Sequence, residues 1–319
     1  MIPKYPYKPI SNIHSLALHL NVTEAFLAEM AARIPNMTRR AEKLKKDGSI
    51  RVTFDAHEPL KSLHHLIATR ILKRVIYPSY LHGSLPKRDI VSNALPHAKA
   101  HTLILDDIKN FYPSISTENI KRMWMQLFHF PDDVSELLAQ LVSLNGSLPQ
   151  GFRTSSFIAN LILWDKEPQL VSELSSMELT YSRYVDDITI SSARPLSKEQ
   201  KTIIRTKVYS MLTAKGLKAK RSKSTIQCKG GQRIVTGLDV SKKRLSIEKQ
   251  ERKRIRAAVH ELKTLGITHP ASVEQIKKIR SAIGRVARLT YFKHPEAARL
   301  NAELEHYKQY LPPINNPKK

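Results

Sequence analysis

The chain has 319 residues, which is enough for several subdomains around a shared core. Its 53 Lys and Arg residues against 28 Asp and Glu give a formal net charge of +25, which indicates a polyanionic partner such as nucleic acid. The only cysteine, Cys228, excludes an internal disulfide and a cysteine-rich zinc site. No apolar run is long enough for a membrane span and no secretory signal is recognisable, so we expect a cytoplasmic protein without a membrane partner.

Residues 1–45 are predicted to be mainly helical, because apolar residues recur there at helical spacing. A β-hairpin is expected next, with a Lys-rich first strand, a turn at Asp47-Gly48 and alternating apolar residues after it. A helix is predicted at about 60–75. Residues 81–100 are polar and contain Gly and Pro, which favours an ordered loop with short turns.

The rest of the chain mixes helices and strands in no regular order, which favours an α+β fold over a parallel α/β fold. The C-terminal tail is expected to be frayed. Helices are predicted at 118–144, 157–174, 198–215 and 248–310. Strands are predicted at 101–107, 179–192 and 232–247.

Two acidic segments carry the strongest functional signal. Asp106 and Asp107 end an apolar strand, and because strand side chains alternate, only one of them can face a common site. The segment itself does not decide which. Asp186 and Asp187 lie at the tip of a predicted strand pair, where their pKa values would rise without a nearby cation. Mg²⁺ prefers such oxygen ligands, although Asp-Asp pairs are also common turn residues on hydrated hairpins.

Three segments resemble, in order and spacing, the polymerase motifs of reverse transcriptases. Motif A is matched by DIKNFYPSI, motif B by SLPQGFRTSSFIAN and motif C by YVDD. The resemblance implies a right-hand polymerase fold with fingers, palm and thumb, and RNA-directed DNA synthesis with two Mg²⁺ ions, for which Mn²⁺ is a substitute. It also implies that the catalytic metal ligands are Asp107, Asp186 and Asp187, with Asp106 facing away.

The same resemblance assigns a nucleotide pocket. Tyr112 matches the aromatic residue that lies under the sugar and disfavours a 2′-hydroxyl, so deoxynucleoside triphosphates are the expected substrates; the alternative is a purely packing role. Gln150 and Gly151 match residues beside the incoming nucleotide. Arg51 matches an arginine that grips the triphosphate. Lys223 is the best match for the lysine near the leaving phosphate, although the Asn that usually precedes it is missing.

Two further motifs narrow the resemblance to retron reverse transcriptases. Asn93 and His97 match the NAxxH motif of that family, and Val235, Thr236 and Gly237 match its VTG motif. These residues are therefore expected to contact the RNA or the template–primer duplex. The alternatives are a capping or core histidine and an ordinary turn after a strand.

A retron resemblance implies particular partners. The template is then a cognate structured noncoding RNA (msr-msd), one of whose 2′-hydroxyl groups primes synthesis, and the product is a branched single-stranded DNA (msDNA). A separate effector protein and a role in anti-phage defence are also implied. Two rival functions are a group II intron-like or diversity-generating reverse transcriptase and a noncatalytic RNA-binding scaffold. The NAxxH and VTG motifs and the expected lack of extra domains oppose the first rival, and the complete acid triad opposes the second.

The predicted C-terminal helices carry a basic face. Lys249, Arg252, Lys253 and Arg256 fall on one side of a helix at i, i+3, i+4 and i+7, with apolar residues on the other side. We expect this face to follow the phosphates of an RNA or RNA–DNA duplex, whereas a merely solvated face is the usual alternative.

Four parts of the chain are expected from these motifs. They are an N-terminal helical segment (1–45), fingers with the NAxxH region (46–105), a palm with motifs A to D and VTG (106–245), and a basic helical thumb with a tail (246–319).

Overall fold

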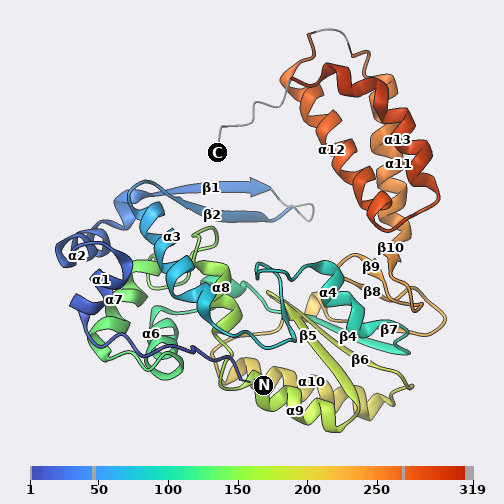
Figure 1. Ribbon diagram of the computed structural model, residues 1–319. Helices are drawn as coiled ribbons and strands as arrows, with labels where there is room; N and C mark the ends of the chain where they lie inside the picture. Colours follow the sequence, from blue (N-terminus) through green and yellow to red (C-terminus); the bar gives the residue numbers. More distant parts are fainter. Residues whose placement is uncertain (1, 45–47, 268–269, 313–319) are drawn as a thin grey trace.

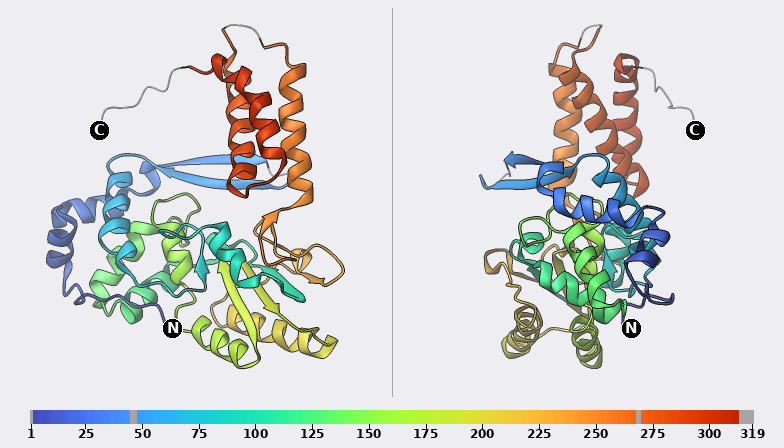
Figure 2. Two further views of the ribbon diagram at one scale, coloured as in Figure 1. Left: turned by 45° about the vertical axis from the view of Figure 1, so that its right-hand side comes forward. Right: turned by 90° about the vertical axis from the view of Figure 1, so that its left-hand side faces the viewer.

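The computed structural model describes residues 2–44, 48–267 and 270–312, so Asp47 of the predicted turn and nearly all of the predicted tail lie outside the described residues. A mixed body of helices and strands carries a separate helical bundle, here called the thumb (Figures 1 and 2), which consists of the helices α11 to α13. Within the described ranges, no helix is long and apolar enough to cross a membrane.

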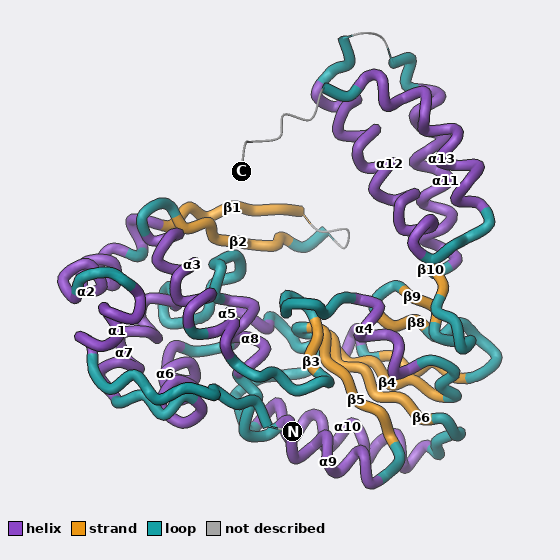
Figure 3. The backbone as a smooth tube through the Cα atoms, in the orientation of Figure 1, coloured by secondary structure: helices purple, strands orange, loops and turns teal. Residues whose placement is uncertain are grey.

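The centre of the body is a five-stranded sheet with the order β3-β5-β6-β4-β7. All neighbouring strands are antiparallel except β3 and β5, which are parallel. Helices α9 and α10 lie along one face of this sheet (Figure 3). The strands are β3 (Leu81–His82), β4 (Thr102–Asp107), β5 (Leu179–Tyr184), β6 (Asp187–Ser192) and β7 (Thr225–Cys228), and the helices are α9 (Glu167–Ser176) and α10 (Lys198–Thr213).

Strand β4 has two distinct faces, as its sequence predicts. Ile104 belongs to the main core, which includes residues of α10, whereas Leu103 belongs to a smaller core with Val235 and Leu238. Because side chains alternate along a strand, the two consecutive acids at the end of β4 are directed to opposite sides of the sheet.

The N-terminal part is less helical than predicted. Residues 38–44 form strand β1 (Thr38–Leu44), which pairs antiparallel with β2 (Ile50–Ala56) from Thr38↔Ala56 to Leu44↔Ile50. The prediction of a helical segment up to residue 45 was therefore wrong at its end, because cross-strand pairing overrides the local preference of this polar stretch. The helices of this part are α1 (Ile13–Leu20), α2 (Glu24–Arg33) and α3 (Leu60–Arg70).

Two longer predicted helical stretches are interrupted. The stretch at 118–144 consists of α6 (Thr117–Leu127) and α7 (Asp132–Val142), with Pro131 at the start of α7. The helix predicted at 157–174 is instead α8 (Ser155–Leu161) followed by α9, which has a proline in its first turn. Proline fits the first turn of α9, where its missing N–H needs no partner, and Pro131 is the residue directly before α7, so a proline marks a new start in both places.

The segment 81–100 is an ordered connection, as expected, but it also contains strand β3 and the short helix α4 (Ile90–Ala94). Asp89 caps α4 by accepting hydrogen bonds from the backbone N–H groups of Val91 and Ser92.

The predicted strands at 232–247 and the basic helices after them are present. Strands β8 (Ile234–Val235), β9 (Leu238–Asp239) and β10 (Ser246–Ile247) form a small antiparallel sheet beneath the thumb. The thumb helices enclose a hydrophobic core of their own that includes Ile255, Val286 and Leu300. These helices are α11 (Lys249–Thr264), α12 (Val273–Tyr291) and α13 (Glu296–Glu305).

Candidate active site

The acidic tip of the site is the turn between β5 and β6. Tyr184 pairs with Asp187, so the turn contains only Val185 and Asp186. Val185 has φ 59°, a conformation that a β-branched residue rarely adopts. Its N–H donates to the carbonyl of His82 at 3.2 Å, and the N–H of Ile108 donates to the carbonyl of Asp186 at 3.0 Å. Neighbouring segments thus hold the strained turn on both sides.

Asp107 lies on the same side of the sheet as the turn. It is directly opposite Asp187 in the β4–β6 register. Asp106 is buried on the other side, where its carboxylate accepts a hydrogen bond from Tyr209 Oη at 3.2 Å and lies 3.9 Å from Arg205 Nε. The structure therefore brings Asp107, and not Asp106, to Asp186 and Asp187.

These carboxylates are electrostatically crowded. Burial within the cleft, together with repulsion from Asp186 and Asp107, raises the pKa of Asp187 to about 6. Burial, with a contribution from Asp107, also raises the pKa of Asp186. The Lys223 ammonium donates a hydrogen bond to Asp107 Oδ2 at 2.6 Å, and this bond raises the pKa of the lysine.

The donor set fits a hard divalent cation, because three carboxylates supply oxygen ligands and their mutual repulsion favours a positive charge between them. Within the part of the chain that the structure describes, however, no three His, Cys, Asp or Glu side chains are grouped so that they could hold a metal ion. Asp107 is instead paired with Lys223, at 2.6 Å.

A cleft of about 700 Å³ joins this tip to the β1–β2 hairpin. It brings together nearly all the residues predicted to act on the nucleotide. Burial and the negative charge of Asp186 raise the pKa of the Tyr112 phenol to about 12, so its hydroxyl is protonated at neutral pH. The predicted residues that line the cleft are Arg51, Asp107, Tyr112, Gln150, Asp186, Asp187 and Lys223.

Gly151 has a different place. It has φ +125°, and a Cβ atom on it would lie 2.4 Å from the carbonyl oxygen of Phe54. The preceding carbonyl, of Gln150, accepts a hydrogen bond from Phe54 N–H at 2.8 Å. The close approach that this glycine permits in the structure is therefore to the backbone of β2, and its place beside the incoming nucleotide stays a prediction.

A buried ion pair next to the turn was not predicted. Arg183 Nε and Nη2 donate to the two carboxylate oxygens of Glu167 at 2.6 and 2.8 Å, and Tyr181 Oη donates to Glu167 Oε1 at 2.6 Å. Arg183 Nη1 donates to the carbonyl of Val185 at 2.9 Å. The sequence signal was a charged residue within a strand, immediately before YVDD.

Motif B also supports the turn of motif C. Its asparagine, Asn160, donates a hydrogen bond from Nδ2 to the backbone carbonyl of Gly83 at 3.0 Å. The backbone carbonyl of Asn160 accepts a hydrogen bond from Arg183 Nη2 at 2.9 Å. A Cβ on Gly83 would lie 2.7 Å from Val185 Cγ2. The two motifs are therefore parts of one packed unit.

The NAxxH side chains are buried in a hydrogen-bonded network. Ser182 Oγ donates to Asn93 Oδ1 at 2.8 Å, so its contact of 2.8 Å with His97 Nε2 requires that nitrogen to donate. His97 Nδ1 then accepts from Ser191 Oγ at 2.7 Å, and burial lowers the pKa of His97 to about 3. Asn93 and His97 are 0% and 1% exposed. The prediction that they contact RNA was wrong for this structure: they attach α4 to the central sheet.

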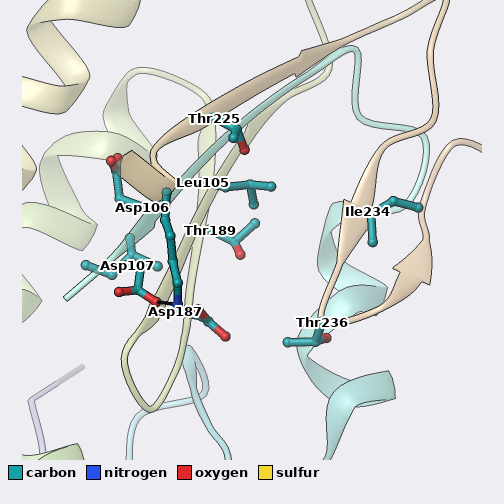
Figure 4. Close-up of a pocket in the computed structure, with 10 residues that line it drawn as sticks. Leu105, Asp106, Asp107, Asp187, Thr189, Thr225, Ile234 and Thr236 are labelled. Atoms are coloured by element: carbon teal, nitrogen blue, oxygen red, sulfur yellow. Dashed lines mark hydrogen bonds and ion pairs between the residues drawn. The ribbon is translucent and has the colours of Figure 1, made fainter. Parts of the chain in front are cut away.

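The VTG motif consists of the last residue of β8 and the two-residue turn between β8 and β9. Val235 pairs with Leu238 and is buried, which corrects its predicted RNA contact. Thr236 and Gly237 have φ 45° and 77°, as a tight hairpin turn requires. Thr236 also lines a hollow of about 200 Å³ that it shares with Asp107 and Asp187 (Figure 4).

The predicted basic face of the thumb is only partly free. Lys249 and Lys253 are exposed. Arg256 Nη1 instead forms an ion pair with Glu296 Oε1 at 2.7 Å, and Arg252 Nη1 lies 3.1 Å from His294 Nε2. Two of the four side chains therefore contact the start of α13 and the segment before it, and the binding of a duplex by this face stays a prediction.

A sheet that carries three carboxylates beside a nucleotide-sized cleft, with Arg51, Lys220 and Lys223 also in its lining, is the arrangement of a nucleic-acid polymerase of the right-hand type. The profile of the family "Reverse transcriptase (RNA-dependent DNA polymerase)" matches residues 43–269. The chain belongs to this family and is a retron-type reverse transcriptase, an RNA-directed DNA polymerase.

Two curated relatives support this assignment over most of the chain. The retron Se72 reverse transcriptase of Salmonella heidelberg (strain 579083-10) is 35% identical, over 95% of this chain and 81% of that protein. The retron Ec48 reverse transcriptase of Escherichia coli is 30% identical, over 93% and 76%. Among solved structures, apo telomerase from Candida tropicalis has a TM-score of 0.48 and 10% identity, covering 85% of this chain and 59% of that chain.

Proposed function

We propose that this enzyme copies part of a cognate structured noncoding RNA (msr-msd) into branched single-stranded msDNA, beginning at a 2′-hydroxyl of that RNA. The observation that carries the catalytic part is the convergence of Asp107, Asp186 and Asp187 with Arg51 and Tyr112 in one cleft. The retron part is supported by relatives that share most of this chain and are named as retron reverse transcriptases.

We assign the metal site to Asp107, Asp186 and Asp187, which would hold two Mg²⁺ ions or Mn²⁺ in their place. When bound, such ions lower the pKa of the attacking hydroxyl and neutralise the leaving pyrophosphate. The chain's own residues hold the substrate: Arg51 is placed to bind the triphosphate, and Lys223 lies beside Asp107 near the same end of the cleft.

Selection among nucleotides is assigned to Tyr112 and Gln150. The Tyr112 ring forms part of the cleft wall beside Asp186, where a ring under the sugar leaves no room for a 2′-hydroxyl on an incoming nucleotide. Deoxynucleoside triphosphates are therefore the proposed substrates. Thr236 faces the acids across the smaller hollow, where the primer end and its RNA partner strand are proposed to lie.

The biological setting is proposed from the family alone. We place the enzyme in the cytoplasm with its msr-msd RNA, its msDNA product and a separate effector protein, in an anti-phage defence system. A group II intron-like or diversity-generating reverse transcriptase is the rival enzyme, and a noncatalytic RNA-binding scaffold is the rival from another class.

The test is to express the chain with its flanking genomic sequence and to separate the extracted nucleic acid on a denaturing gel, with and without RNase. We expect a discrete short DNA whose mobility changes after RNase treatment and which is absent for Asp186→Asn. Asp133→Asn, an exposed carboxylate on α7, is the matched control and should leave the product unchanged. A folded wild-type protein that yields no such DNA would support one of the rivals, and normal yield from Asp186→Asn would refute the metal site.

A further inference from the structure

A groove of about 510 Å³ lies where the thumb meets the body, outside the catalytic cleft. One wall comes from Val91 of α4 and from Leu95, the residue directly after this helix. The opposite wall is the end of α12, with Tyr291 and Phe292, and the loop before β10 closes the groove through Leu245. Three separate segments of the chain therefore build it.

The walls of the groove are apolar and accessible. Leu95 is 57% exposed and Tyr291 is 66% exposed, although both are large apolar side chains. The Tyr291 and Phe292 rings are perpendicular, at 83°, with centroids 5.2 Å apart. Phe292 is half-buried and packs against the cores on both sides, so it provides a rigid support for the exposed Tyr291 ring.

The rim of the groove is positively charged. Lys243, Arg244 and Lys293 line it and are exposed, and no acidic residue is among its lining residues. Lys293 has φ 50°, in the position after α12 where glycine is the usual residue. Arg244 Nη2 reaches the carbonyl of Phe292 at 3.5 Å, which holds the loop beside the helix end.

We propose that this groove binds an unpaired nucleotide segment of the RNA partner, with a base stacked on Tyr291 and the adjacent phosphates on Lys243, Arg244 and Lys293. An apolar floor with an exclusively cationic rim matches a nucleobase joined to phosphates, whereas an apolar protein segment would not require the cations. The inference rests on the proposed function for the identity of the RNA. If the groove binds RNA, then Val91 of α4 and Leu95, which follows this helix, contact the RNA, although Asn93 and His97 of the NAxxH motif are buried.

The groove can be tested by fluorescence anisotropy with the full chain and a labelled 12-nucleotide single-stranded RNA. An unlabelled RNA-template/DNA-primer duplex first fills the catalytic cleft, so that the labelled RNA reports other sites. We expect Tyr291→Ala to weaken binding about tenfold and Tyr291→Trp to restore it, because stacking needs only an aromatic face. Tyr7→Ala, an exposed tyrosine near the N-terminus, is the matched control.

Lys293→Gly tests the rim without disturbing the helix end, because glycine prefers the left-handed conformation that this residue adopts. We expect the dependence of log Kd on log salt concentration to become shallower by about 0.7. Lys198→Ala, an exposed lysine on α10, should leave the slope unchanged.

Primer extension on the generic duplex separates this inference from the proposed function. Normal extension by Tyr291→Ala together with weakened RNA binding would support the groove. RNA binding that is unchanged in Tyr291→Ala and Lys293→Gly would overturn it, as would a parallel loss of binding and extension, which would indicate a damaged thumb. A wild-type chain that binds through the groove but extends no primer would refute only the proposed function.

Discussion

Arg183 Nη1 donates a hydrogen bond of 2.9 Å to the carbonyl oxygen of Val185, the first residue of the turn that presents Asp186. The same guanidinium is held by both carboxylate oxygens of Glu167. A planar guanidinium with five donors can satisfy a carboxylate and several carbonyl groups at once, which a lysine cannot. This buried pair therefore fixes the conformation of the turn that carries Asp186.

Arg183→Lys should lower kcat about 10- to 100-fold with little change in the KM for deoxynucleotides, because the turn is displaced while the nucleotide pocket persists. Steady-state primer extension measures both constants. Arg70→Lys is the matched control, since Arg70 also donates to a carbonyl, that of His19, at 2.7 Å but far from the turn. A rise in KM with unchanged kcat would contradict this positioning role.

Glu167→Gln should destabilise the fold by about 3–5 kcal/mol, because it leaves the Arg183 charge buried without its partner. Chemical denaturation gives the free energy of unfolding. A decrease of less than about 1 kcal/mol in the free energy of unfolding would show that Arg183 finds another partner. The Glu167–Arg183 pair would then not be essential for the stability of the fold.

Gly151→Ala should displace β2 and raise the KM for deoxynucleotides, because the added Cβ would meet the carbonyl oxygen of Phe54. We also expect a loss of about 1–3 kcal/mol in the free energy of unfolding. Gly216→Ala separates the steric clash from the strain of a positive φ, since Gly216 also has positive φ but has open space around its Cβ position. An equal effect of both substitutions on KM would exclude the steric explanation.

Tyr112→Ala should reduce the preference for deoxynucleotides over ribonucleotides about tenfold or more, because the ring no longer excludes a 2′-hydroxyl. The ratio of kcat/KM for dGTP and GTP measures this preference. Tyr112→Phe keeps the ring and should keep the preference. If the ratio is unchanged in Tyr112→Ala, the ring has only a packing role.

His97 should make the fold less stable in acid. Its pKa is about 3 in the folded protein, below the ordinary value of 6.5, so between these values the unfolded chain binds more protons. The free energy of unfolding then falls as the pH decreases from 6.5 towards 3, by about 2 kcal/mol at pH 5. His97→Gln should remove this part of the pH dependence, whereas His57→Gln, an exposed histidine, should not. If the free energy of unfolding depends on pH in the same way for wild type and His97→Gln, the assignment of this pH dependence to His97 is refuted.

Local patterns were sufficient to predict which acidic residues the structure brings together. The alternation of side chains along the strand predicted that only one of Asp106 and Asp107 faces the site, and the motif resemblance indicated Asp107. In the structure Asp107 lies opposite Asp187, in agreement with that choice. The adjacent acids in an apolar strand pair predicted the turn, because no core position tolerates two unpaired carboxylates.

What the patterns missed depends on contacts between distant segments. Asn93 and His97 were recognised as a motif, but their burial follows from the docking of α4 on Ser182 and Ser191, about 90 positions later in the chain. Arg183 looked like a polar residue on a strand, because its partner lies on another helix. The pairing of residues 38–44 likewise requires the second strand of the hairpin.

The thumb has a hydrophobic core that shares no buried residue with the main core, within the ranges that the structure describes. Phe292 is the side chain that packs against both the thumb core and the small core beneath the VTG turn. Two separately packed units joined at such a pivot can rotate as rigid bodies, because neither must expose its interior. The junction consists of Phe292 and of strand β10, which pairs with β9 and contributes Ile247 to the thumb core. Rotation about it would let the thumb follow a bound duplex of changing length while both cores stay closed.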